Sequence, residues 1–230
     1  MNTRQATIDS PAARPPWAGI TVSALSLLAM VAIAWAVWDS LPEFVTTREA
    51  TATRSGIEVP RLVLAAALPA TLVVIGVVMT GSTLLGSRLR HRLDPMLVAT
   101  PSAQTRSMNV LFVVLPLLLL VLQAGLLLRT AGREFPMEQA VAVAFGVLLI
   151  GLGNILPKIA PSRIPGGGGG RLVLAWQRSQ RAGGTAMVVL GIACAVTAFF
   201  FPPILVAVVS AFLIAAVYLL MVVLTVTRLR

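Results

Sequence analysis

The side chains that most often do chemistry are scarce in this sequence of 230 residues. It has one cysteine, Cys194, and one histidine, His91. These counts exclude an intrachain disulfide framework and the zinc motifs that need several Cys or His ligands. Five glycines at 166–170 follow no predicted strand and lack the Lys-Ser/Thr ending of a phosphate-binding loop, so we interpret them as a flexible tether. We therefore expect no catalytic residue, no metal and no cofactor, and predict that the protein is not an enzyme.

The densest group of polar and conformationally special residues lies at the end of one apolar stretch and in the segment after it. An asparagine can satisfy the last carbonyls of a helix there, a proline stops the helix, and a lysine meets its negative end favourably. These residues are candidates for partner binding, and a plain helix terminus would use the same types, so both interpretations stay open. The candidates are Gly153, Asn154, Leu156, Pro157, Lys158, Trp176, Arg181 and Gly183.

The elements that position these residues are transmembrane helices. The hydrophobic set makes up 57% of the chain and charged residues 11%, against roughly 25% charged in soluble domains. A helix needs about 20 apolar residues to cross a bilayer. Six stretches without an internal charge meet this requirement, at 19–38, 62–85, 108–128, 137–156, 184–201 and 204–227. We predict an all-α fold, a polytopic membrane helix bundle with six transmembrane helices. The first stretch is too long for a signal peptide, whose apolar region has roughly 7 to 15 residues.

The net charge of +10 indicates how the bundle is oriented. With the N-terminus inside, the inner segments carry +1, +3, +5 and +2 in chain order, and the two outer loops carry −1 and 0. Lys and Arg are enriched in cytoplasmic loops. We therefore predict both termini in the cytoplasm. This placement accounts for the basic surplus without direct binding of nucleic acid.

Two further local patterns lead to expectations. Residues 172–181 combine apolar and polar or basic side chains, which is consistent with a short helix lying on the anionic inner leaflet. The apolar ones are Leu172, Val173, Leu174 and Trp176, and the polar or basic ones are Gln177, Arg178 and Arg181. Ala207, Ala211 and Ala215 recur every four residues in the last span. Small residues let helices approach closely, so we expect this face to pack within the chain, with a dimer contact as the alternative.

The segment from Gly153 to Lys158 reads Gly-Asn-x-Leu-Pro-Lys, and Trp176, Arg181 and Gly183 follow before the next span. In these positions the chain resembles the SdpI family of bacterial membrane proteins. It departs from the family at Ser162, where Asn is usual, and at the glycine run, which replaces a Gly-x-Arg stretch. The first outer loop is similar to a degenerate form of a domain of unknown function often fused to such proteins.

The resemblance divides the chain into three parts. They are a cytoplasmic tail at 1–18, two helices at 19–107 with an outer loop 39–60 and a basic inner loop 86–107, and a four-helix SdpI-like region at 108–230 with a cytoplasmic loop 157–183.

The resemblance implies a non-enzymatic integral membrane protein of the bacterial cytoplasmic (plasma) membrane. It would act in immunity or resistance to a toxic peptide, in membrane signalling through a sequestered cytoplasmic transcriptional repressor, or in both. Its partners would be the lipid bilayer, a peptide toxin and the repressor. The alternative is a permease-type subunit of a transporter working with a separate ATPase, indicated by the six spans and the basic inner loops.

Overall fold

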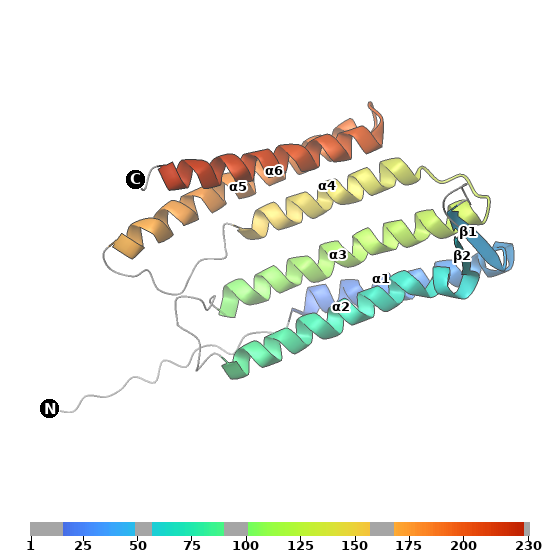
Figure 1. Cartoon of the computed structure of the whole chain (residues 1–230). Helices are drawn as coiled ribbons and strands as arrows, with labels where there is room; N and C mark the ends of the chain where they lie inside the picture. Colours follow the sequence, from blue (N-terminus) through green and yellow to red (C-terminus); the bar gives the residue numbers. More distant parts are fainter. Residues whose placement is uncertain (1–15, 49–56, 90–100, 157–167, 228–230) are drawn as a thin grey trace.

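The computed structural model describes residues 16–48, 57–89, 101–156 and 168–227, which form six long helices and one small hairpin (Figure 1). All six helices are long and apolar enough to cross a membrane, which confirms six candidate spans among the described residues. The predicted bounds differ by a few residues, since α1 ends at Ala36 and not at residue 38, and α5 ends at Thr197 and not at residue 201. The start of α1 and the end of α6 lie at the same end of the bundle (Figure 1). The helices are α1 (Trp17–Ala36), α2 (Arg61–Leu89), α3 (Pro101–Thr130), α4 (Met137–Ile155), α5 (Gly168–Thr197) and α6 (Pro203–Thr227).

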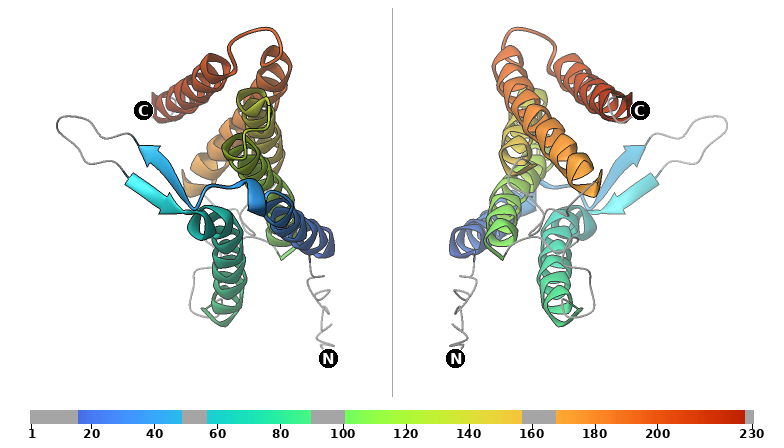
Figure 2. Two further views of the ribbon diagram at one scale, coloured as in Figure 1. Left: turned by 90° about the vertical axis from the view of Figure 1, so that its right-hand side faces the viewer. Right: turned by 90° about the vertical axis from the view of Figure 1, so that its left-hand side faces the viewer.

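The helices form a row rather than a closed ring. Helix α3 contacts α1 and α2 on one side and α4 on the other, and α4 and α5 share the most extensive contact in the bundle. Helix α6 lies at the edge and touches mainly α5 (Figure 2). Many large apolar side chains are exposed, including Leu28, Val77 and Phe212 at 66%, 66% and 72%. Such surfaces suit hydrocarbon, where apolar groups need no protein cover.

A β-hairpin interrupts the otherwise helical fold between α1 and α2, after a short helical turn η1 (Trp38–Ser40). Its strands are β1 (Phe44–Arg48) and β2 (Ile57–Pro60), paired antiparallel with Val45 opposite Val59. The expectation of an all-α fold is therefore incomplete, because the outer loop contains this pair of strands. Both strands contain β-branched residues, which favour extended backbone, and the Arg61 backbone N–H donates to the Glu43 carbonyl at 3.0 Å beside them.

A few polar contacts join helices inside the bundle. The Gln123 side chain is fully buried, and its Nε2 donates to the Ala65 carbonyl of α2 at 2.8 Å. The Gly19 backbone N–H, in the first turn of α1, donates to Asn109 Oδ1 of α3 at 2.7 Å. That bond satisfies one of the N–H groups that every helix leaves unpaired at its start, so α3 caps α1.

Helix α5 is longer than the sequence suggests. It begins at Gly168 and runs without a break for 30 residues, so residues 168–170 are helical and the expected tether is wrong for them. Residues 172–181 belong to the same continuous helix and do not form a separate surface helix. The physical reason is cooperativity, since extending an existing helix needs no new nucleus even through poor helix formers.

The small-residue seam of α6 is not covered by the chain. Ala211 and Ala215 are exposed, whereas Ser210 is buried and Ile214 and Val217 are half-buried. The expectation of packing within the chain is therefore wrong for these two alanines. Because α6 stands at the edge of the row, only one of its faces can meet another helix, and that face lies beside the seam.

Candidate functional site

The predicted motif residues lie where α4 ends and in the first half of α5. Gly153 is buried against α5, and a Cβ added there would lie 2.5 Å from the Gly184 carbonyl oxygen and 2.9 Å from Met187 Cβ. Gly183, the neighbour of Gly184, is buried as well. The glycine of the motif therefore lets the two backbones approach closely, which is a packing role.

The other motif residues differ in their surroundings. Asn154 and Arg181 are exposed, Asn154 has an interaction partner, and Leu156 is half-buried. Trp176 lies within α5. Pro157 and Lys158 lie outside the described residues. Gly153 of α4 therefore packs against α5 beside Gly183. Arg181 is accessible at the same end of the bundle, where α4 ends.

The opposite end of the bundle carries the hairpin. Val45 packs against a buried apolar cluster that includes Val37 and Leu127, which anchors the hairpin to α1 and α3. The Arg61 guanidinium lies over the Trp38 ring, 4.7 Å from its centroid, and this cation–π contact ties η1 to the start of α2.

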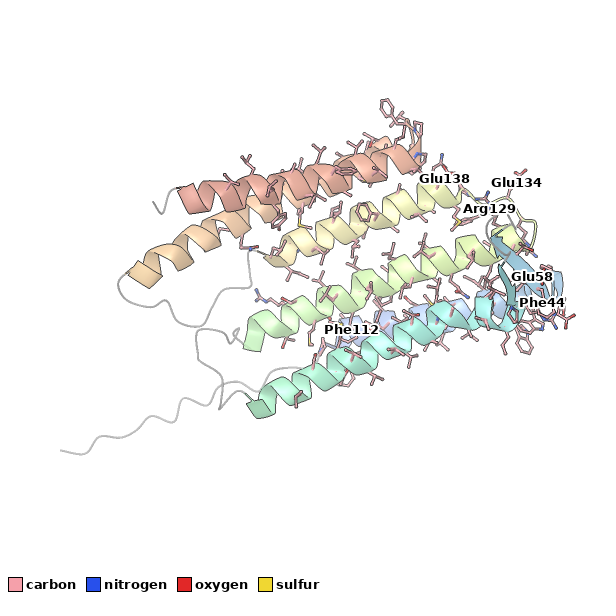
Figure 3. The ribbon with its side chains drawn as sticks, viewed as in Figure 1. Phe44, Glu58, Phe112, Arg129, Glu134 and Glu138 are labelled. Atoms are coloured by element: carbon pink, nitrogen blue, oxygen red, sulfur yellow. The ribbon has the colours of Figure 1, made fainter. Side chains whose placement is uncertain are left out.

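The outer face of the hairpin is accessible. Neighbouring residues on a strand point to opposite faces, so the cross-strand pairs Phe44–Pro60 and Thr46–Glu58 share the face opposite to Val45. All four of these residues are exposed, Phe44 at 55%. Figure 3 shows Phe44 and Glu58 at this end of the molecule, at the same end as Arg129, Glu134 and Glu138.

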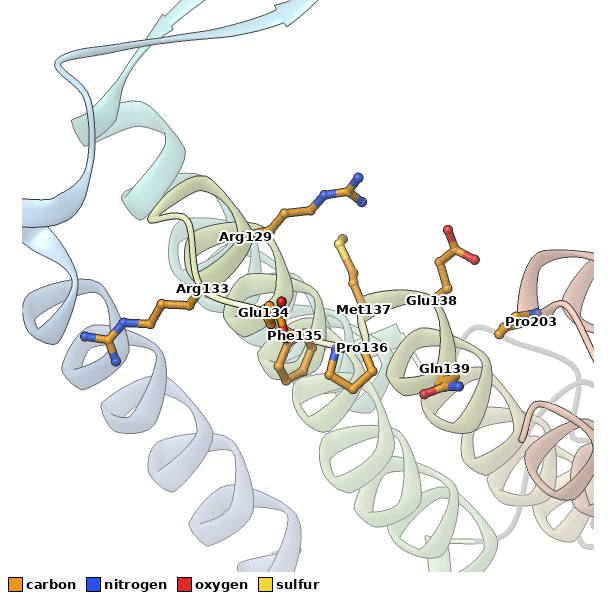
Figure 4. Close-up of a pocket in the computed structure, with 9 residues that line it drawn as sticks. All are labelled: Arg129, Arg133, Glu134, Phe135, Pro136, Met137, Glu138, Gln139 and Pro203. Carbon is orange, nitrogen blue, oxygen red and sulfur yellow. The ribbon is translucent and has the colours of Figure 1, made fainter. Parts of the chain in front are cut away.

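A pocket of about 690 Å³, lined by charged and apolar residues, opens at the same end, around the connection between α3 and α4. Two arginines and two glutamates give it balanced charge, and none of the four has an ion-pair partner within the described part of the chain. Its lining residues are Arg129, Arg133, Glu134, Phe135, Pro136, Met137, Glu138, Gln139 and Pro203 (Figure 4).

An apolar groove of about 440 Å³ lies next to this pocket, along α3 and α4. The two cavities share Pro136 and Gln139, and Gln139 is the single polar side chain of the groove. Its lining residues are Val114, Leu117, Leu118, Val121, Pro136, Gln139, Ala140, Val143, Ala144, Val147 and Phe199.

The sequence indicates these pocket residues only through their charges. Arg129, Arg133 and Glu134 lie between two spans, and Glu138 lies at the start of the second, so four charges occur within ten positions. The groove had no signal, since apolar side chains on two helices are typical of any transmembrane pair.

The described residues offer few side chains that could act in catalysis or bind a metal. No group of three or more His, Cys, Asp or Glu residues among them lies close enough to hold a metal ion. The Cys194 thiol is buried and donates to the Ala142 carbonyl at 3.5 Å, which is an interhelical packing contact. His91 lies outside the described residues.

No family model, curated protein or solved structure matches this chain.

Proposed function

We propose that this chain is a non-enzymatic, SdpI-like protein of the bacterial cytoplasmic membrane that confers resistance to a toxic peptide and holds a cytoplasmic repressor. The observation that carries the proposal is the hairpin, a two-stranded sheet outside the helix bundle with an accessible face. Among the described residues no third strand covers its edges. The resemblance from Gly153 to Lys158 supports the same assignment.

The charge pattern supports an orientation with both termini in the cytoplasm. The hairpin and the α3–α4 connection lie at one end of the bundle (Figure 1). Of the three connections at that end, the first two carry −1 and 0 and the one between α5 and α6 is uncharged, and the basic segments belong to the other end. Under the positive-inside rule the hairpin faces the cell exterior, where a secreted peptide arrives.

An open strand edge can bind a peptide by adding it as a further strand. Backbone hydrogen bonds then supply affinity, and side chains on the sheet face supply selectivity. Phe44 offers an exposed aromatic surface, and Glu58 offers a carboxylate on the same face. Peptides that attack anionic membranes are commonly cationic and amphipathic, so this pair matches their chemistry.

The repressor would bind at the opposite end. Arg181 is exposed there on α5, and Asn154 is exposed on α4. These residues belong to the motif that carries the family resemblance. Their position at the basic end of the bundle agrees with a cytoplasmic partner.

The test is survival of the producing bacterium after deletion of the gene, with challenge by secreted cationic peptides. We expect deletion to raise sensitivity and the wild-type gene to restore resistance. Phe44→Ala and Glu58→Lys should restore it poorly. Phe212→Ala is the matched control, because Phe212 is also an exposed phenylalanine but lies on α6.

Two results would count against the proposal. Unchanged sensitivity after deletion, with no cytoplasmic protein co-purifying, would refute it. Co-purification of an ATPase in place of a repressor would favour the transporter alternative. Reporter fusions to each terminus check the orientation independently.

A further inference from the structure

The pocket and the apolar groove adjoin, because Pro136 and Gln139 line both, and together they offer a charged mouth and an apolar interior. In the groove, α3 contributes Val114 to Val121 and α4 contributes Gln139 to Val147. The pocket residues lie where these helices end and begin. The ends of helices that just cross the hydrocarbon core lie where a bilayer changes from hydrocarbon to headgroups. The combination matches an amphiphile, with its polar part in the pocket and its apolar part in the groove.

The length of the groove matches one leaflet. From Gln139 to Val147 the α4 backbone rises roughly 12 Å at about 1.5 Å per residue. Half of a bilayer's hydrocarbon core is about 15 Å thick. A single alkyl chain entering from the mouth would therefore lie along the groove for most of the depth of its own leaflet.

The volume of the groove favours a slender occupant. A helix about 10 Å across occupies roughly 400 Å³ per turn, given a pitch of about 5.4 Å. The groove measures about 440 Å³, so it would hold about one turn of a helix. The groove therefore cannot enclose a transmembrane peptide helix, whereas an alkyl chain can lie within it.

The charges at the mouth select the headgroup. Arg129 suits a phosphate, since a guanidinium can donate two parallel hydrogen bonds to it, whereas Arg133 extends away from Arg129 to the other side (Figure 4). Glu134 and Glu138 would repel a purely anionic headgroup and accept hydrogen bonds from a primary ammonium. Figure 4 shows the Arg129 and Glu138 side chains extending on the same open side of the pocket, with Met137 between them.

We infer that this depression is a specific site for a zwitterionic phospholipid with a primary amine, phosphatidylethanolamine. Its phosphate binds Arg129, its ammonium group binds Glu138, and one acyl chain fills the groove between α3 and α4. This inference does not depend on peptide binding, because no residue of the hairpin lines either cavity.

The experiment is native mass spectrometry of the purified full-length chain after incubation with three phospholipids of identical acyl chains. The probes are phosphatidylethanolamine, phosphatidylcholine and phosphatidylglycerol. We expect preferential retention of phosphatidylethanolamine. Glu138→Gln should weaken this retention by roughly tenfold, because it removes one charge-assisted hydrogen bond. Glu138→Arg should reverse the preference toward phosphatidylglycerol.

The groove is tested separately. Ala144→Phe places a ring in the groove and should lower retention of all three lipids, whereas Ala193→Phe on the exposed face of α5 should not. Equal retention of the three lipids by the wild-type chain would overturn the inference, as would an unchanged preference in Glu138→Arg. A retained mass that a protease removes would identify a peptide as the occupant and would equally overturn it.

Discussion

The contact between α4 and α5 leads to the sharpest stability prediction. Gly191 and Gly146 face each other there, and a Cβ added at either would lie 2.6 Å from the other's carbonyl oxygen. The added carbon at Gly191 would also lie 3.0 Å from the Ile150 backbone nitrogen. These neighbours are backbone atoms, so rotation of a side chain cannot relieve the overlap. Gly191→Ala must therefore push the two helices apart, by roughly 1 Å to restore ordinary contact distances.

The expected cost follows from two opposing terms. Overpacking a tight contact costs about 1–3 kcal/mol, and rigid backbone neighbours favour the upper part of that range. Replacing a helical glycine by alanine stabilises the helix by up to about 1 kcal/mol. We expect Gly191→Ala to lower the free energy of unfolding by about 2 kcal/mol.

Gly76→Ala is the matched control, because a Cβ added at Gly76 in α2 meets nothing within 4 Å. This variant keeps only the helix-propensity gain and should be more stable than the wild type by up to about 1 kcal/mol. The two variants should therefore differ by about 3 kcal/mol, or roughly 6–12 °C in Tm for a chain of this length. Thermal unfolding in detergent, followed by far-UV circular dichroism, measures the difference.

The double variant Gly146→Ala/Gly191→Ala tests the mechanism itself. Once one alanine has separated the helices, the second meets less overlap, so the combined cost should fall below the sum of the single costs by at least about 0.5 kcal/mol. Equal stability of Gly191→Ala and Gly76→Ala, or strict additivity in the double variant, would refute the close-approach explanation.

Three further predictions concern polar contacts between elements, each checked against the wild type in detergent. Asn109→Ala should lower the free energy of unfolding by about 1 kcal/mol, because it removes the cap of α1. Asn109→Asp should keep most of this stability, since its carboxylate keeps the acceptor and suits the positive start of the helix. Gln123→Leu should be as stable as the wild type or more so. It removes a hydrogen bond worth about 0.6 kcal/mol together with a buried, unpaired Oε1 that costs about 1–3 kcal/mol. Gln123→Ala leaves a cavity and should lower the free energy of unfolding by about 2 kcal/mol or more. Arg61→Ala removes a contact to Trp38 worth about 0.5–1 kcal/mol, so the hairpin amides should exchange hydrogen faster, and Arg61→Lys should exchange at an intermediate rate.

The fold could be predicted in its coarse form. The predicted start of the fourth span at Met137 and the predicted end of the sixth span at Thr227 match the observed helix bounds. These bounds are predictable because an apolar run and the polar residues flanking it are local properties of the chain. The start of α5 could not be placed in this way. Its glycines and basic residues are poor evidence for a membrane span, and only cooperative extension from the apolar half of the helix explains why Gly168 is helical.

The candidate site, too, could be predicted only in part. The motif around Gly153 was found from residue types, but the sequence did not distinguish partner binding from packing. The structure shows that Gly153 lies against Gly184, which assigns this one residue to packing. The pocket beside Arg129 and Glu138 was not predicted, since its shape depends on how far α3 and α4 separate.

By itself the sequence determined the six spans and the one-sided distribution of basic charge. The cost of burying backbone in hydrocarbon acts on about 20 consecutive residues at a time, so these features need no knowledge of the partners. Only the tertiary structure decided which helices meet, where glycines replace side chains between α4 and α5, how β1 pairs with β2, and where a groove remains. Each of these depends on contacts between residues distant in the chain, and nearly every transmembrane segment offers the same apolar side chains for such contacts.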